Sequence, residues 1–485
     1  MTLLKAEDIS VQDGKSTLLE PVSLQLSPGE PLVILGETGS GKSLMAQALM
    51  GTLPPELHAK GRVAIGTQVL NPGAPERFRG LWGRKIGVLP QEPWLSLDPL
   101  MPARDQVAET HEIVRGLRRS DARRQAMADL AALGLAGAEA RYPHELSGGM
   151  AQRVAIAAAR AGGARIVIAD EPTKGLDAAR RDDVASLLLS EMGETGGLLV
   201  ITHDLALARQ LGGRMIVLRA GRVVERGATE TLFANPKDAY TKEFFAADPE
   251  CWIPRPSAAR GGPAVVSARD ISLSRGGKML FSGVSLDVMQ GGVFGVTGPS
   301  GCGKSSLGDA LLGLIGPDRG TISRRPGPHP HDFQKLYQDP VSAFPGRRTL
   351  GQTIADTARL SGARQGDVEN LLDRLGLDAG LLKRRPGAVS GGELQRLSLL
   401  RVLLRNPSFI FADEPTSRLG PITQARVIAL LTETTQRDGT ALMLVSHDAA
   451  LIRHTSDTVL TLGVPGNPRP SANAFSHRRV ASGLH

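Results

Sequence analysis

The stretch that decides the fold of this chain is Gly-Glu-Thr-Gly-Ser-Gly-Lys-Ser at Gly36–Ser43, which fits the pattern G-x-x-x-x-G-K-[ST]. The pattern returns as Gly-Pro-Ser-Gly-Cys-Gly-Lys-Ser at Gly298–Ser305. A loop of this kind (a P-loop) presents backbone N–H groups to phosphates at a helix N-terminus, and its glycines let the backbone approach closely. Because the copies lie one domain length apart, we expect two phosphate-binding units in one chain.

The surroundings of each loop agree with this interpretation. A short apolar run comes before each loop, at Pro31–Leu35 and Val293–Val296, and a run that favours helix comes after it. Other apolar runs have the length of buried parallel strands, namely Ile166–Ala169, Leu198–Ile201, Phe409–Ala412 and Ala441–Val445. The pattern predicts an α/β fold built on parallel sheets.

The composition is that of ordinary globular protein. The chain has 485 residues, of which 41% are hydrophobic and 22% charged, and this length predicts two to four domains. Neither a signal peptide nor an apolar run long enough to cross a bilayer is expected. Only Cys251 and Cys302 are cysteines, which excludes a disulfide framework and favours a reducing compartment. The net charge of +8 fits nucleic acid, an anionic membrane face or a basic surface, and does not choose among them.

The same series of motifs follows each P-loop in the same order. In the first copy the series is Gln91, Leu146–Arg153 (Leu-Ser-Gly-Gly-Met-Ala-Gln-Arg), Asp170-Glu171-Pro172-Thr173, Gly175-Leu176-Asp177 and Thr202-His203-Asp204. In the second it is Gln338, Val389–Arg396 (Val-Ser-Gly-Gly-Glu-Leu-Gln-Arg), Asp413-Glu414-Pro415-Thr416 and Ser446-His447-Asp448. A lone Asp-Glu-Pro or Ser-His-Asp is usually loop polarity, but two ordered series are not explained that way.

On these motifs the chain resembles the ABC ATPase family over nearly all of residues 1–465. The resemblance implies two P-loop NTPase domains in tandem, each with a RecA-like core, an antiparallel β subdomain and a helical signature subdomain. The predicted borders are residues 1–250 for the first domain, 251–265 for a Pro/Gly-rich linker, 266–463 for the second domain and 464–485 for a disordered tail.

A finer resemblance is to the ATP-binding subunits of dipeptide, oligopeptide and nickel importers, here fused into one chain. It rests on Pro90–Pro99, on Tyr337–Ala343 and on Asn-Pro-Lys-Asp-Ala-Tyr-Thr at Asn235–Thr241. Asp238 and Ala239 stand where those subunits have His and Pro. Such subunits often end in a cysteine-rich extension, but here that region holds Cys251 alone, so no iron–sulfur cluster is expected.

Motif and resemblance together assign roles toward ATP and Mg²⁺. The expected phosphate-binding residues are Gly36, Gly39, Ser40, Gly41, Lys42 and Ser43 in the first loop and Gly298, Gly301, Gly303, Lys304 and Ser305 in the second. The expected Mg²⁺ ligands, direct or through water, are Ser43, Asp170, Gln91, Ser305, Asp413 and Gln338. The expected catalytic residues are Glu171 and Glu414 as bases for the attacking water, His203 and His447 on the γ-phosphate, and Gln91 and Gln338 as sensors.

In this family two domains dimerise head to tail, so each ATP lies between one P-loop and the signature motif of the other domain. By resemblance, Lys42 works with Ser390 and Gly392, and Lys304 works with Ser147 and Gly149. Hydroxyls, N–H groups and a helix N-terminus would then aim positive charge at the γ-phosphate.

Two departures from the family pattern affect these expectations. The second interface loop reads Arg418-Leu419-Gly420 and lacks the aspartate found at Asp177, so we expect the Lys42 site to hydrolyse ATP more slowly. The aromatic residue that often stacks on adenine is absent from both copies, so loose base selectivity is expected. Two interpretations of Arg275 remain open: its guanidinium stacks on the base, or it is a solvated loop arginine.

The resemblance implies an ATP-hydrolysing, energy-coupling subunit of an importer for small peptides, nickel or metal chelates. Its expected partners are two transmembrane permease subunits, docking near Gln91–Leu100 and Gln338–Pro345, and a solute-binding protein. Its expected place is peripheral, at the cytoplasmic face of the inner membrane. One alternative is a soluble twin ATPase acting on ribosomes or nucleic acid, which the short connector disfavours. Another is a fused sugar-importer ATPase. The second signature of such proteins is usually degenerate, whereas the second signature here, Val389–Arg396, is not. No nucleic-acid partner is expected.

Overall fold

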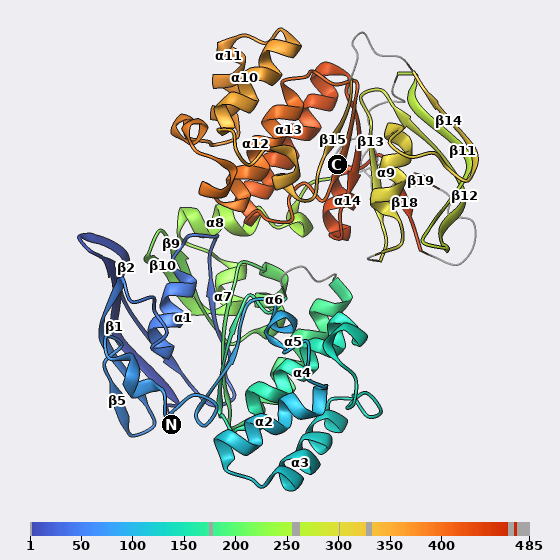
Figure 1. Ribbon diagram of the computed structural model, residues 1–485. Coiled ribbons are helices and arrows are strands. Elements are labelled where there is room, and N and C mark those ends of the chain that lie inside the picture. Colours follow the sequence, from blue (N-terminus) through green and yellow to red (C-terminus); the bar gives the residue numbers. More distant parts are fainter. Residues whose placement is uncertain are drawn as a thin grey trace, which may run out of the picture. The chain divides into compact units, whose positions relative to one another are not determined.

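The chain is described from a computed structural model, which covers residues 2–173, 178–254, 262–299, 301–325, 332–463 and 470–472 (Figure 1). It divides into two compact units, Met1–Phe245 and Ala246–His485, close to the predicted domain border at residue 250. The first interface loop (Gly175-Leu176-Asp177), the middle of the predicted linker and most of the predicted tail lie outside the described residues.

The first unit alternates strands and helices after an antiparallel start. Its strands are β1 (Leu4–Asp13), β2 (Ser16–Leu26), β3 (Leu32–Leu35), β4 (Leu57–Ile65), β5 (Gln68–Leu70), β6 (Ile86–Leu89), β7 (Ile166–Asp170), β8 (Gly197–Thr202), β9 (Arg214–Arg219) and β10 (Arg222–Ala228). Its helices are α1 (Lys42–Met50), α2 (Ala103–Arg115), α3 (Arg119–Ala132), α4 (Gly148–Ala161), α5 (Ala178–Met192), α6 (Leu205–Leu211), α7 (Thr229–Ala234) and α8 (Ala239–Ala246).

These elements form a parallel core sheet, an antiparallel sheet and a helical part. The core sheet has the order β10-β9-β3-β8-β7-β6, in which only the β10–β9 pair is antiparallel. The antiparallel sheet has the order β2-β1-β4-β5. Helix α1 contacts β1 on one side and β7 and β8 on the other, and Met45 and Leu49 are fully buried there. Helices α2, α3 and α4 have a separate apolar core around Val107, Leu130 and Val154.

The second unit repeats this plan. Its strands are β11 (Ala264–Arg275), β12 (Lys278–Met289), β13 (Val293–Thr297), β14 (Arg319–Arg324), β15 (Phe333–Leu336), β16 (Phe409–Asp413), β17 (Ala441–Val445), β18 (Thr458–Thr461) and β19 (Ser471–Ala472). Its helices are α9 (Lys304–Leu312), α10 (Leu350–Ser361), α11 (Gln365–Arg374), α12 (Gly391–Leu403), α13 (Pro421–Asp438) and α14 (Ala449–Thr455). The sheet orders are β12-β11-β14 and β15-β16-β17-β13-β18-β19.

The predicted α/β fold with two tandem copies is therefore confirmed, and the predicted buried strands lie within one residue of β3, β7, β8, β16 and β17. The repeat extends to a backbone irregularity near the start of each antiparallel sheet. Asp8 and Asp270 have φ of 49° and 53°, and Gly61 and Gly320 cross them so closely that an added Cβ would meet their carbonyl oxygens at 2.7 and 2.5 Å. Only glycine fits at these crossings.

The structure differs from the expected disordered tail at Ser471 and Ala472. These two residues pair antiparallel with Val459 and Thr458 of β18, in the position that β10 takes beside β9 in the first unit. The pairing satisfies backbone groups at the sheet edge, which the polar composition of the segment does not reveal. Among the described residues, no helix combines the length and apolarity needed to cross a membrane.

Candidate nucleotide-binding sites

Each P-loop joins the end of a core strand to the first turn of a helix. In the first unit the loop runs from β3 to α1, which begins at Lys42, and in the second it runs from β13 to α9, which begins at Lys304. Gly41 and Gly303 have φ of 97° and 101°, a region that other residues rarely adopt. A Cβ on Gly36 would lie 2.3 Å from the Leu218 carbonyl oxygen, so this glycine is also required by contact.

The lysine of each loop reaches back into its own loop. Lys42 Nζ donates to the carbonyl oxygens of Gly36 (2.7 Å) and Glu37 (2.8 Å). Lys304 Nζ donates to those of Gly298 (2.8 Å) and Pro299 (2.9 Å). Both side chains are buried, at 5% and 6% exposure, so two ammonium groups lie inside the loops where anionic oxygens would be attracted.

The residues present fit a bound phosphate chain. The Ser40 hydroxyl is buried and, among the described residues, has no hydrogen-bond partner. A Cβ on Gly39 or Gly301 would meet no atom within 4 Å, which leaves room beside each loop. A buried hydroxyl, an ammonium group and a helix N-terminus together form an anion-binding site.

Burial lowers the pKa of Lys42, against the opposing pull of the Glu171, Asp170 and Glu37 carboxylates. The nearest of these, Glu171 Oε1, lies 4.0 Å from Lys42 Nζ. The predicted base therefore lies beside the predicted phosphate-binding lysine, although the two are far apart in sequence.

Glu171 lies directly after β7 and is held on both sides. Thr202 Oγ1 donates to Glu171 Oε2 at 3.3 Å, and His203 Nδ1 lies 2.8 Å from Glu171 Oε1. Burial alone raises the pKa of Glu171, but the hydrogen bond and charge of His203, together with Lys42, outweigh it and bring the pKa below its usual value. The carboxylate is thus held in its ionised, proton-accepting form.

The second unit gathers the same types of side chain around Glu414. His447 Nε2 lies 2.6 Å from Glu414 Oε1, and Gln338 Nε2 donates to Glu414 Oε2 at 3.0 Å. In the first unit the corresponding Gln91 is exposed and makes no hydrogen bond to Glu171 in the described part of the chain. The structure therefore joins Gln338 to its glutamate but not Gln91.

The two glutamates share an unusual backbone conformation. Glu171 and Glu414 both have φ of 48°, in the left-handed region that is costly for residues with a Cβ. Hydrogen bonds from their N–H groups to the carbonyl oxygens of Ile201 (2.8 Å) and Val445 (3.1 Å) maintain it. Both glutamates directly follow the last residue of a core strand, and Glu171 Oε1 lies 4.0 Å from the P-loop lysine Lys42.

The structure also tests the fit of Mg²⁺ to the predicted ligands. In the second unit the Ser305 hydroxyl hydrogen-bonds to Asp413, whose pKa is raised by burial and by the nearby Glu414. A hydroxyl beside a carboxylate is an oxygen set of the kind that Mg²⁺ accepts. In the first unit Asp170 ends β7 and Ser43 is exposed in the first turn of α1.

The signature serines begin the helices α4 and α12. Ser147 Oγ accepts the Met150 N–H at 3.3 Å, and Ser390 Oγ accepts the Glu393 N–H at the same distance. The second serine also donates its hydroxyl to Glu393 at 2.8 Å. Gly149 and Gly392 lie in the first turns of these helices, where N–H groups point outward.

Sequence reasoning missed a pair of buried glutamines on the signature helices. Gln152 Nε2 donates to the Pro172 carbonyl oxygen at 2.8 Å, and Gln395 Nε2 donates to the Glu414 carbonyl oxygen at 3.2 Å. Both side chains are 1% exposed. Both glutamines occupy the same position of the two signature motifs, and this repetition could have indicated a structural role. Each bond ties a signature helix to the segment of the predicted catalytic glutamate in its own unit.

We expect Gln152→Leu to destabilise the first unit by about 1–3 kcal/mol, because the Pro172 carbonyl would lose its buried donor. Differential scanning calorimetry of the full chain measures this change in the free energy of unfolding. Gln125→Leu is the matched control, since Gln125 bonds to Asp129 on an exposed face of α3 and we expect a change within about 0.5 kcal/mol. Equal shifts for the two variants would contradict a structural tie at Gln152.

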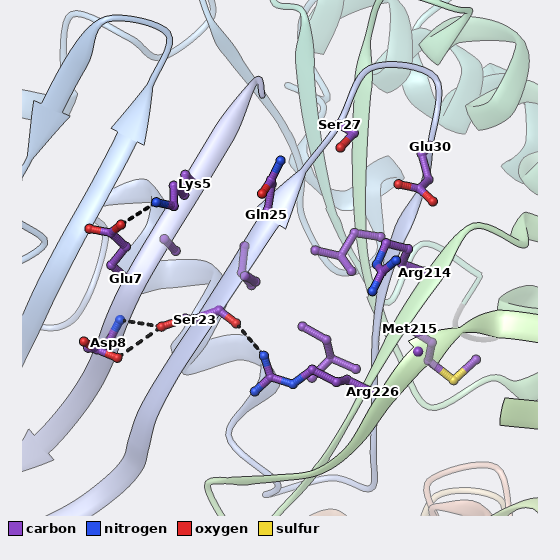
Figure 2. Close-up of a pocket in the computed structure, with 15 residues that line it drawn as sticks. Lys5, Glu7, Asp8, Ser23, Gln25, Ser27, Glu30, Arg214, Met215 and Arg226 are labelled. Carbon is purple, nitrogen blue, oxygen red and sulfur yellow. Dashed lines mark hydrogen bonds and ion pairs between the residues drawn. The ribbon is translucent and has the colours of Figure 1, made fainter. Parts of the chain in front are cut away.

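A cleft of about 640 Å³ in the first unit lies away from these residues (Figure 2). It is lined by β1, β2, β9 and β10 and includes the Lys5–Glu7 ion pair (2.6 Å) and the bond from Arg226 to the Ser23 carbonyl oxygen (3.2 Å). It contains no glycine-rich loop, no helix N-terminus and none of the predicted site residues. The predicted phosphate-binding residues therefore lie outside this cleft.

The chain matches the family model described as ABC transporter over residues 19–174 and 281–417. It is 34% identical to the ABC transporter ATP-binding protein YejF of Escherichia coli (strain K12), covering 98% of this chain and 97% of that protein. It is 32% identical to the peptidoglycan transport ATP-binding protein YejF of Agrobacterium fabrum, covering 98% and 94%.

A further relative is the glutathione import ATP-binding protein GsiA of Salmonella typhimurium, 32% identical over 91% of this chain and 81% of that protein. Among solved structures, the RNase-L inhibitor matches with a TM-score of 0.67 and 22% identity, covering 96% of this chain and 90% of that one. The structural likeness shows a shared tandem fold and nothing about shared partners.

Proposed function

This chain belongs to the ABC transporter family, with two ATPase domains in tandem, and on that premise we propose that it is the ATP-hydrolysing subunit of an importer for peptides or peptide-like solutes. The observation that carries the proposal is the paired constellation Lys42–Glu171–His203 and Gln338–Glu414–His447. It occurs in a chain that is similar over 91% of its length to a glutathione import ATP-binding protein. The names of the relatives include peptidoglycan, glutathione and oligopeptide transport, and these solutes share amino acids joined by amide bonds.

In the proposed reaction, the lysines and loop N–H groups hold the β- and γ-phosphates of ATP, the substrate. Glu171 and Glu414 each orient a water in line with the γ-phosphate and accept its proton, and His203 and His447 hold both the glutamate and the γ-phosphate. Mg²⁺, when bound by Ser305 and Asp413 and by their counterparts Ser43 and Asp170, neutralises charge on the phosphates.

Each nucleotide would be closed off by the signature of the other unit, so Ser390 and Gly392 would cover the Lys42 site, and Ser147 and Gly149 the Lys304 site. Support comes from the first turns of α4 and α12, which begin at the signature motifs. The N–H groups of a helix N-terminus carry partial positive charge and attract phosphate. Closure on ATP and opening after hydrolysis would supply the mechanical step of transport.

We further propose that two permease subunits bind beside the glutamine loops, at the cytoplasmic face of the membrane, and that a solute-binding protein delivers the cargo. Leu95 and Leu100 are 71% and 85% exposed near Gln91, and Val341 is 53% exposed near Gln338. Exposed apolar side chains grouped near a site are typical of protein contacts.

We expect Leu95→Glu with Leu100→Glu to reduce permease co-purification from membranes by at least about tenfold, because charge placed in an apolar interface must be desolvated. The measurement is affinity purification of the tagged chain followed by mass spectrometry. Val69→Glu is the matched control, since Val69 is 62% exposed on β5 and away from the glutamine loop. Recovery of ribosomes or nucleic acid in place of permeases would overturn the proposal in favour of the soluble twin ATPase.

A further inference from the structure

The first P-loop contacts a helix from the far end of its unit. The Glu37 N–H donates to the Tyr240 hydroxyl at 3.3 Å, across 203 residues of sequence. Tyr240 is 5% exposed, and burial raises its pKa to about 12, so its hydroxyl stays neutral and able to accept this bond. Glu37 is the second residue of the loop, and its carbonyl oxygen accepts from Lys42.

Tyr240 is itself fixed from several sides. Asp238 Oδ1 accepts the Tyr240 N–H at 2.8 Å at the start of α8, and Glu225 of β10 accepts the Asp238 N–H at 3.2 Å. The Arg219 guanidinium lies over the Tyr240 ring, 4.8 Å from its centre, and the Phe244 ring lies 5.7 Å away. The hydroxyl is therefore held in place by a strand and a helix rather than by a flexible loop.

The same hairpin supports the P-loop at a second point. The Gly221 N–H, in the turn between β9 and β10, donates to the Ser40 carbonyl oxygen at 2.9 Å. Glu37 and Ser40 lie on either side of the turn that must surround a phosphate. The β9–β10 hairpin and α8 thus hold both ends of this turn.

The second P-loop cannot make the first of these bonds. Pro299 takes the place of Glu37, and proline has no N–H to donate. Gly463 lies beside it, where an added Cβ would come within 3.1 Å of Pro299 Cδ. In the described part of the second unit, no helix follows β18 to match α8.

We propose that Tyr240 is a positioning residue that braces the first P-loop and raises the affinity of that loop alone for a nucleoside triphosphate. The hydroxyl holds the loop in its binding shape before the nucleotide arrives, so less conformational freedom is lost on binding. This inference rests on the nucleotide binding proposed above for Lys42.

The test uses the full chain with one site disabled at a time. In a Lys304→Ala chain, only the first site binds a fluorescent methylanthraniloyl-ATP, and Tyr240→Phe is expected to weaken its binding about two- to tenfold, the net worth of one neutral hydrogen bond. In a Lys42→Ala chain the same substitution is expected to change second-site binding by less than twofold. Glu37→Pro, which copies the second loop, is expected to weaken first-site binding by the same factor as Tyr240→Phe. The double variant with both substitutions is expected to bind as weakly as either single variant, because both remove the same hydrogen bond.

Tyr240→Phe keeps the ring that packs on Arg219 and Phe244, so the melting temperature serves as the folding control. Equal weakening at both sites, additive effects of Glu37→Pro and Tyr240→Phe, or unchanged first-site binding would each overturn the brace while leaving the proposed function intact. Absence of nucleotide binding already in the unmutated chain would overturn the proposed function itself.

Discussion

Replacing Glu171 and Glu414 together by glutamine is expected to lower steady-state ATP hydrolysis at least about a hundredfold and to leave ATP binding in place, since a positioned general base contributes about 10²–10⁴-fold. Glutamine keeps the size of the side chain and the Thr202 contact, but it cannot accept the proton of the attacking water. Phosphate release measures the rate, and methylanthraniloyl-ATP binding is the control. A double variant that still hydrolyses ATP at the normal rate would remove both glutamates from the chemistry.

The single variants report on the expected difference between the two sites. Gly420 replaces the interface-loop aspartate in the second unit, and Arg418 of that loop pairs with Asp339 at 3.2 Å, next to Gln338. This loop is thus held to the glutamine loop of its own unit. We expect Glu171→Gln alone to lower turnover less than Glu414→Gln alone, because the Lys42 site is the one this loop would serve. Equal losses would leave the asymmetry unsupported.

The second large effect concerns the signature motif. Gly149→Asp is expected to lower vanadate-trapped nucleotide on the Lys304 unit about a hundredfold, because it would place a carboxylate where the signature N–H groups would face a charged transition state. A Cβ on Gly149 meets no atom within 4 Å, and an aspartate in the first turn of α4 favours the helix dipole. We therefore expect the variant to fold normally, so that a loss of label reports on the proposed contact between the signature and a nucleotide.

Trapping with photoreactive azido-ATP, followed by proteolysis, shows which unit holds the label. Gly80→Asp is the matched control, because a Cβ there also meets no atom within 4 Å and the residue lies outside every motif. Loss of label from the Lys42 unit, with the Lys304 unit unaffected, would mean that each nucleotide is enclosed by a single unit.

The local features of this chain could be predicted from the sequence because each depends on a few adjacent residues. Gly41 permits the left-handed turn of the P-loop, and the apolar run at Phe409–Ala412 has the length and composition of a buried strand. The ordered motifs also predicted the tandem ABC fold, since the repeat of a whole series has one structural explanation. The site residues remain predictions: Glu171 and Glu414 directly follow core strands, whereas the signature residues begin α4 and α12.

Other features required the tertiary structure because they join residues distant in sequence. The bond from Glu37 to Tyr240 depends on where β10 and α8 return to the core sheet, and no spacing rule specifies that. The same holds for Gln152 on Pro172 and for Ser471 on β18. The stretch between Thr52 and Gly80 is rich in Gly and Pro, yet it contains β4, β5 and the fully buried Phe78. Adjacent residues determine local backbone preference, whereas the burial of a residue depends on which distant segments of the chain pack against it.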